Sequence, residues 1–433
     1  MKCLWLGWLV FGGMLGAGAL SAGTQDSEFN VNNAYTVETV LVNGDGWTTN
    51  VAADRGEKIS SPLRKDIVAI IGEKLNPATL DDLARRLRKE FHARAVEHHI
   101  LRGTVPDCVQ VVFDVQVRPT RFDVAVPKFL YQAKQGWSGA VEGTAIVRHN
   151  SVTVGLVSDG DELAERYAGI TARYQNSHLG SDRVHFGLEY GAFHEQWNAG
   201  TVEALPPQRT EMGSMASSVT SDVYRTRQFF EPVATFQVWR PLHLSLGASF
   251  ESLQDQYPVA HTESANAAVA SLRYHQRTEG SDLLQDFDAG YDLRLASGAM
   301  HSDLIYARHR WEFRYTLTHG KQVLIEDATA GMIAGQAPLF ERFVLGNSST
   351  LRGWNKFALD PLGGNRMVHN TVEYRYGAFQ IFYDTGAIWD GGQAVEDRNS
   401  AGIGLRQGAF SASVAFPLRE GHIDPIFMIG MNY

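Results

Sequence analysis

The chain has 433 residues, with 42 glycines, 22 phenylalanines, 15 tyrosines and 9 tryptophans, and a net charge of −9 at pH 7. Its length exceeds that of one ordinary domain, and its acidic balance argues against a nucleic-acid partner. Two cysteines are present, too few for a cysteine-based metal cluster.

Residues 1–23 are typical of a secretory signal peptide, because one lysine precedes an apolar run that ends in small residues. Residues 24–34 are expected to be a linker. After this segment the sequence contains no run of about 18 apolar residues, so no transmembrane helix is predicted. An exported chain of this kind is periplasmic, secreted or an outer-membrane barrel, and the glycine-rich and aromatic-rich composition favours the barrel.

Residues 35–118 carry both strand and helix signals and predict a small α+β domain. The predicted order is a strand ending at Asn-Gly, two helices within 61–91, and two strands on either side of a Pro-Asp turn. The second helix has a basic face. That face is either solvated or a binding surface for a chaperone or lipid head groups, and the usual behaviour of charge runs favours the solvated face. Its residues are Arg85, Arg86, Arg88, Lys89 and Arg94.

Residues 119–138 are expected to link this domain to a region of strict alternation, 139–433. A soluble sandwich also alternates, but its polar face is rich in lysine, and lysine is nearly absent here. The alternation therefore predicts a transmembrane antiparallel β-barrel of about 16 strands, with lipid outside and a charged lumen. Closure is obligatory, because an open edge in lipid would leave unpaired backbone groups.

A long segment at about 334–365 has neither a helix nor a strand period, and it contains Leu351, Arg352, Gly353 and Trp354. A loop of this length inside a compact domain is functional or disordered, and its aromatic residues argue against disorder. In the two strands that follow, alternation turns Glu373 and Asp384 inward.

The chain ends in an alternating strand with an aromatic last residue, which is typical of outer-membrane targeting. Its apolar face carries Phe427, Ile429, Met431 and Tyr433.

No enzyme motif is complete. His194 and Glu195 lack a second histidine four residues on, so they do not form a zinc-binding helix motif. The glycines of 402–408 lie in a strand with no helix to present a phosphate site. We therefore expect no catalytic residue, no metal and no cofactor.

The Leu-Arg-Gly-Trp loop and the two strands after it resemble the BamA-like outer-membrane assembly superfamily, also called the bacterial surface antigen family. The resemblance implies that residues 35–118 are one periplasmic POTRA domain, which makes the chain a single-POTRA member. It implies that 334–365 is the sixth surface loop, between strands eleven and twelve, folded into the lumen. It also implies that Arg352 contacts Glu373 and Asp384 there.

The resemblance implies a protein of the bacterial outer membrane that inserts or translocates proteins or lipid. Its gate would lie between a first strand near 139–148 and a last strand near 423–433. Expected partners are outer-membrane lipid and unfolded or exported client proteins. A separately encoded passenger is also possible, because no Gly-x-Ser-x-Gly motif or hydrolase-sized stretch is present. The alternative is a passive pore or structural surface antigen with the Arg352 loop as a plug.

Overall fold

The computed structural model describes residues 34–44, 47–53, 58–91, 93–116, 120–205, 223–257, 261–280, 282–419 and 424–432. The predicted signal peptide and nearly all of the linker 24–34 lie outside these ranges. The chain divides between Arg118 and Pro119 into two compact units.

The N-terminal unit is a four-stranded sheet with two helices. Its sheet order is β2-β1-β4-β3, in which β1 and β4 run parallel and the other neighbours antiparallel. The prediction missed β2, because four residues are too few to show alternation. The elements are β1 (Thr36–Gly44), β2 (Trp47–Asn50), α1 (Ser61–Ala69), α2 (Pro77–Glu90), β3 (Ala95–Arg102) and β4 (Cys108–Gln116).

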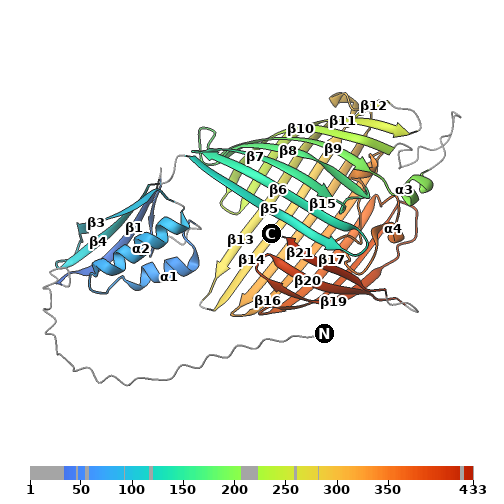
Figure 1. Cartoon of the computed structure of the whole chain (residues 1–433). Coiled ribbons are helices and arrows are strands. Elements are labelled where there is room, and N and C mark those ends of the chain that lie inside the picture. Colours follow the sequence, from blue (N-terminus) through green and yellow to red (C-terminus); the bar gives the residue numbers. More distant parts are fainter. Residues whose placement is uncertain are drawn as a thin grey trace, which may run out of the picture. The chain divides into compact units, whose positions relative to one another are not determined.

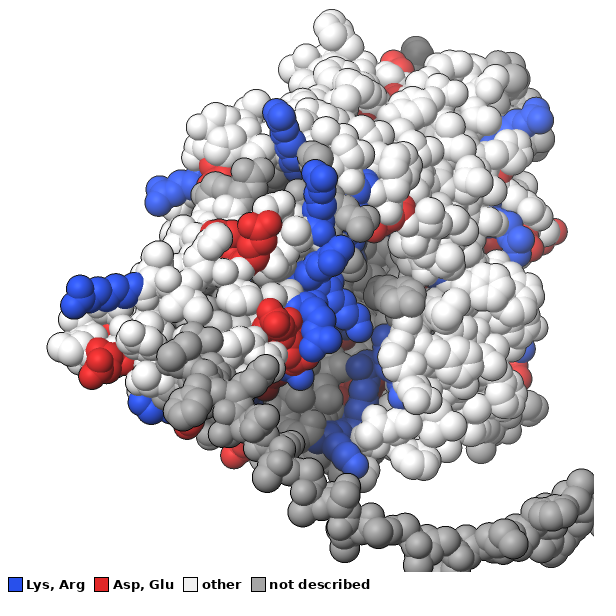
Figure 2. Space-filling view, turned by 60° about the vertical axis from the view of Figure 1, so that its left-hand side comes forward, with Lys and Arg blue, Asp and Glu red and all other residues white. Residues whose placement is uncertain are grey.

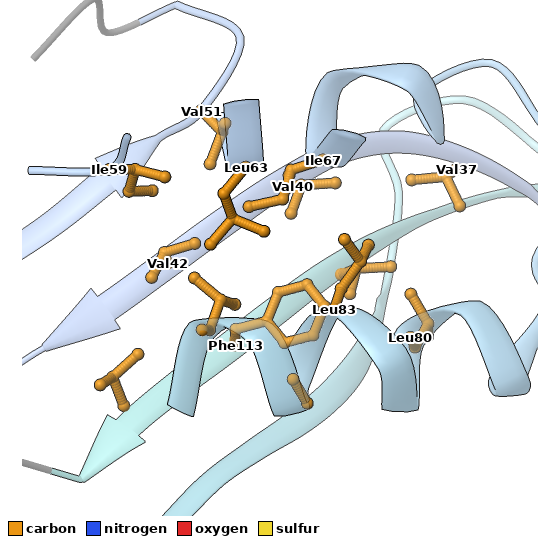
Figure 3. Close-up of a cluster of buried hydrophobic side chains, with 14 of the residues drawn as sticks. Val37, Val40, Val42, Val51, Ile59, Leu63, Ile67, Leu80, Leu83 and Phe113 are labelled. Atoms are coloured by element: carbon orange, nitrogen blue, oxygen red, sulfur yellow. The ribbon is translucent and has the colours of Figure 1, made fainter. Parts of the chain in front are cut away.

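The core of this unit lies between the helices and the two central strands (Figure 3). Helix α2 begins where the side chain of Asn76 accepts a hydrogen bond from the backbone N–H of Ala78 at 3.0 Å. Its leucines recur at helical spacing, so one face is buried. Members of the core include Val37, Val40, Val42, Leu63, Ile67, Leu80, Leu83, Leu87 and Phe113.

The basic face of α2 is exposed and partly neutralised by the unit's own carboxylates. Arg85 pairs with Asp82 at 3.0 Å, and Arg86 pairs with Asp82 at 3.2 Å and also contacts Asp66. Exposed pairs of this kind contribute about 0–1 kcal/mol each. These contacts favour the solvated-face interpretation.

The C-terminal unit is a closed antiparallel barrel (Figure 1). Its strands are β5 (Thr120–Gln132), β6 (Gly136–Val147), β7 (Asn150–Asp159), β8 (Arg166–Asn176), β9 (Val184–Gln196), β10 (Val223–Trp239), β11 (Leu242–Tyr257), β12 (Thr262–Ser264), β13 (Ala267–Glu279), β14 (Leu283–Ala296), β15 (Tyr306–His319), β16 (Gln322–Gly335), β17 (Arg366–Tyr376), β18 (Phe379–Trp389), β19 (Arg398–Gln407), β20 (Phe410–Pro417) and β21 (Ile426–Asn432). Two short helices, α3 (Ala199–Ala204) and α4 (Lys356–Leu359), lie in connections.

The barrel has 16 strands. The three-residue β12 and the longer β13 both pair with β11, so they occupy one position among the seventeen named segments. Pairing of β21 with β5 closes the ring. The predicted fold class, a small α+β domain followed by a barrel of about 16 antiparallel strands, is confirmed.

The expected linker at 119–138 is wrong, because Thr120–Gln132 is the first barrel strand. The predicted first strand near 139–148 is instead the second, β6. A bulge between Ala125 and Lys128 shifts the register by one residue. Outward side chains therefore change from even positions, such as Phe122, to odd positions, such as Phe129. This change of phase hid the strand in the sequence.

The barrel wall is apolar outside and charged inside. In β17 and β18, Val372, Tyr374, Ile381 and Tyr383 are exposed, whereas Glu373, Phe382 and Asp384 are buried. Large continuous areas of the visible surface carry no charged side chain (Figure 2). This arrangement fits lipid outside and a polar lumen.

No helix in the described part of the chain is long and apolar enough to cross a membrane.

The connections at the two ends of the barrel differ in length. At one end, consecutive strands are joined by tight turns, such as 320–321 between β15 and β16 and 377–378 between β17 and β18. At the other end lies the longest described connection, 336–365 between β16 and β17. The predicted bounds 334–365 begin two residues too early, inside β16.

Candidate functional site

The Leu351–Trp354 segment, here called the tip, lies in the connection between β16 and β17. Counted from β5, these are the eleventh and twelfth strands, as predicted. Residues 336–365 are here called the tip loop. Helix α4 follows the tip at once, and the side chain of Asn355 caps it by accepting from the N–H of Phe357 at 3.2 Å.

Arg352 joins the tip to the barrel wall. Its Nε and Nη2 donate to the two oxygens of Asp384 at 3.0 and 2.8 Å, a bidentate pairing. Its Nη1 donates to Glu373 Oε2 at 3.0 Å, and its backbone N–H also donates to Asp384 at 3.0 Å. The structure thus brings together the three residues that the sequence singled out.

The carboxylate of Asp384 is fully enclosed, since its side chain is 0% exposed. Thr371 Oγ1 donates to it at 2.9 Å, and Ser400 Oγ lies 3.4 Å away. The guanidinium also lies 3.4 Å from the ring centre of Phe382, a cation–π contact. Removing one partner of a buried, hydrogen-bonded charge pair costs about 3–5 kcal/mol, because the other charge remains unpaired and buried.

The residues beside Arg352 let the backbone approach the wall. Leu351 is buried, has φ of 44°, and its N–H donates to Nε2 of His369 at 3.1 Å. A Cβ on Gly353 would lie 2.7 Å from Ser400 Cβ and 2.9 Å from the backbone of Phe416. No side chain fits there, which explains glycine at this position.

Trp354 extends the contact to a third wall strand. Its Nε1 donates to the carbonyl of Asn399, in β19, at 2.9 Å. The guanidinium groups of Arg398 and Arg419 lie 5.4 and 5.7 Å from its ring. The tip therefore contacts the twelfth, thirteenth and fourteenth strands.

A second charge cluster holds the start of the tip loop. Glu341 pairs with Arg294 of β14 at 3.3 Å and with Arg308 of β15 at 3.4 Å. Its neighbour Arg342 is buried and pairs with Asp390 at 2.6 Å. The same guanidinium donates at 2.7 Å to the carbonyl of Leu362, on the returning limb of the loop.

On the far side, the tip loop is bound to the connection 160–165 between β7 and β8. The ammonium of Lys356 is buried and donates to three carbonyl oxygens of that connection, those of Gly160, Glu162 and Ala164. Burial lowers the pKa of Lys356 to about 8. Ser348 donates through its N–H and its hydroxyl to Asp161, at 3.0 and 2.5 Å.

The predicted C-terminal strand is β21. Phe427 and Ile429 are exposed on its outer face, and Met431 is half-buried. Tyr433 lies outside the described residues.

Several residues of the site carried no signal in the sequence. Lys356, Glu341 and Ser348 are loop residues whose partners lie far away in the chain. Phe382 is two residues from Asp384 in the same strand and so faces inward with it, and this alternation was the one feature of the sequence that indicated its place in the site.

One group among the described residues has the geometry of a metal site. Ligand atoms of His275, Asp286 and Asp288 lie within 4.8 Å of one another. His275 Nδ1 lies 2.7 Å from Asp288 and 3.4 Å from Asp286. The hydrogen bond between His275 Nδ1 and Asp288 accounts for the shorter distance, and we assign no metal.

Replacing Arg352 by alanine removes the cation that pairs with Asp384 and one of the two that pair with Glu373, the other being Arg375 at 2.6 Å. We expect Arg352→Ala to destabilise the folded barrel by about 3–5 kcal/mol. The readout is the temperature at which the unheated, fast-migrating form is lost on a denaturing gel, together with the folding yield. Arg314→Ala is the matched control, because the Arg314–Asp327 pair is largely exposed and contributes about 0–1 kcal/mol. An unchanged transition for Arg352→Ala contradicts this role.

Gly353→Ala tests the close approach of the tip to the wall. The added methyl group must push the tip away from Ser400 and Phe416, so we expect a loss of about 1–3 kcal/mol in the same melting assay. Gly143→Ala is the control, because nothing lies within 4 Å of its added Cβ. Equal melting of the two variants means that the tip does not need this approach.

Comparison with known proteins identifies a family domain in the C-terminal part of the barrel. Residues 273–429 match the Omp85 superfamily domain. No characterised protein matches the chain significantly in sequence. BamA from Haemophilus ducreyi lacking POTRA domains 1–3 is similar in structure, with 15% identity, a TM-score of 0.58, and coverage of 92% of this chain and 84% of that one. CdiB from Acinetobacter baumannii has 14% identity, a TM-score of 0.51, and coverage of 93% and 74%.

At these identities the structural likeness concerns the fold. The matched domain includes β17, β18 and β19, the strands that hold the tip. Residues 273–429 therefore form an Omp85 superfamily domain, and the chain as a whole shares the fold of BamA.

Proposed function

We propose that this protein inserts or translocates client proteins at the outer membrane through the seam between β5 and β21. The observation that carries the proposal is the shortness of that seam. β5 and β21 share five residue pairs, whereas β14 and β15 share fourteen. The N-terminal half of β5, residues 120–125, pairs with β6 alone.

A short ladder is the place where a closed barrel separates at the lowest cost, because fewer backbone hydrogen bonds are broken. The unpaired half of β5 is also a strand edge, and such an edge pairs readily with another extended chain. Pro127 lies at the bulge, where its missing N–H removes no ladder bond. The seam thus combines a short β5–β21 ladder with a strand edge that can pair with an incoming client strand.

The N-terminal unit fits a client-binding role. Its sheet has two edges, β2 and β3, each with one neighbour. On β3, Ile100 and Leu101 are exposed. We propose that this unit is a single periplasmic POTRA domain and that it receives client strands by edge pairing. The partners are then outer-membrane lipid and exported client proteins, with a separately encoded passenger as one candidate client.

A passive pore is the second candidate, and the double attachment of the tip loop favours it. The loop is bound both to β17–β19 and to the connection 160–165, as expected of a plug. Steady conductance that rises when 343–362 is removed, with no effect on any client protein, supports this reading.

A disulfide across the seam tests the gate. In a Cys108→Ser background, Tyr131→Cys and Ile429→Cys place thiols on directly paired residues of β5 and β21. Paired strand residues have Cα separations that suit a disulfide. We expect oxidation to abolish client export or insertion in cells and reduction to restore it, because the seam then opens again.

The control disulfide joins Leu317→Cys and Leu324→Cys, which pair within the long β15–β16 ladder. We expect it to leave client export unchanged. If the oxidised seam variant exports its client at the normal rate, the gate proposal is wrong.

A further inference from the structure

The tip loop crosses behind the seam and holds both of its flanks. On one side, Arg352 and Trp354 bind β17, β18 and β19. On the other side, the carbonyl of Gly346 accepts from Gln135 at 3.3 Å, and Lys356 binds the connection 160–165. Only β20 and β21 stand between β19 and the seam in the strand order. The loop is therefore a brace across the seam.

Lys128 is a seam residue whose side chain binds the connection 160–165, to which the tip loop is also bound. It lies at the bulge of β5 and is paired with Asn432, the last described pair of the seam. Its side chain is 15% exposed, and its ammonium donates to Asp159 at 2.6 Å and also to Asp161. One residue of β5 thus contacts both β21 and the connection 160–165.

Asp161 is shared between the seam and the brace. Its Oδ2 accepts from Lys128 and, at 2.5 Å, from the hydroxyl of Ser348 in the tip loop. Burial acts to raise the pKa of Asp161, but the charge of Lys128 and the hydrogen bonds of Ser348 outweigh burial and lower that pKa. The chain of contacts Lys128–Asp161–Ser348 is here called the relay.

Lys128 leaves Asp159 and Asp161 when β5 moves away from β21 and also shifts relative to β7, the strand that carries Asp159. The carboxylates of Asp159 and Asp161 then remain close together with like charges in a mostly buried site. Their repulsion displaces the connection 160–165, whose carbonyls bind Lys356. Loss of Lys128 from the seam therefore weakens the hold on the tip loop, and release of the tip loop equally weakens the hold on β5.

We propose that Lys128 is a positioning residue that couples opening of the β5–β21 seam to release of the tip loop through Asp161 and Ser348. The inference rests on the proposed seam gate. It adds a specific linkage: the closed seam and the bound tip are one state, and the open seam and the released tip are the other.

The test measures tip release with one thiol. In the Cys108→Ser background, Leu351→Cys places a thiol that is fully buried while the tip is bound. Its rate of labelling by a membrane-impermeant maleimide in proteoliposomes reports release. Arg352→Ala, which frees the tip from the other flank, sets the upper limit. All variants are first checked for the folded form by gel migration.

We expect Lys128→Met to raise the labelling rate at least fivefold, the lower end of ordinary coupling between sites. Lys128→Arg keeps the charge and should stay within about twofold of the parent. Lys134→Met is the matched control. Lys134 pairs with Asp424 across the same seam at 2.7 Å, but this pair is exposed and is not part of the relay. Its labelling rate should equal that of the parent.

The seam disulfide distinguishes an effect of Lys128→Met that acts through opening of the seam from a direct effect on the tip loop. If Lys128 acts through the seam, the oxidised Tyr131→Cys/Ile429→Cys pair cancels the effect of Lys128→Met on labelling. An increase that persists with the seam closed overturns the relay, as does an unchanged rate for Lys128→Met. Should Lys128→Met fail to fold, Ser348→Ala breaks the other bond of Asp161 and is expected to act in the same direction.

These outcomes are distinct from those of the export test. A confirmed relay with normal export through the oxidised seam removes the proposed function and leaves the coupling. Blocked export with unchanged labelling removes the relay and leaves the gate.

Discussion

The structure of the lumen depends on one buried cation. Arg352 is enclosed by the barrel wall and pairs with Asp384 and Glu373, so the loop arginine and the fully buried Asp384 depend on each other for a charge partner. This mutual dependence holds a 30-residue connection (336–365), whereas most connections at the other end of the barrel have two or three residues. Glu341 and Lys356 then fix the two limbs of the loop, through ion pairs to β14 and β15 and through hydrogen bonds to the connection 160–165.

Among the described residues, the ladders of the barrel are shortest on the two sides of β21, which shares six residue pairs with β20 and five with β5. Closure in lipid requires every backbone group to be paired, yet β5 and β21 share a ladder of five pairs. The tip loop supports this short ladder from inside, because its contacts lie on both sides of it. Opening of the proposed gate therefore breaks only a small number of backbone bonds and buried ion pairs.

The sequence predicted much of this arrangement because alternation reports which face of a strand is buried. It predicted a barrel of about 16 strands and the inward parity of Glu373 and Asp384, whereas the position of the loop between the eleventh and twelfth strands follows from the family resemblance. It failed at β5, where a bulge inverts the alternation near Pro127, and at β2, which is too short to show a period. It also missed Lys128, Asp161 and Lys356, since long-range ion pairs have no local pattern.

The central claim is that this barrel moves client proteins, and the most direct measurement is quantitative comparison of the outer-membrane and secreted proteomes with and without the chromosomal gene. The account predicts the loss of one or more specific proteins from these fractions, restored by the wild-type gene and not by a variant with its seam permanently cross-linked. Loss of a few proteins identifies a dedicated translocator, and a broad fall in barrel proteins identifies a general insertase. Unchanged proteomes contradict the account and favour a passive pore.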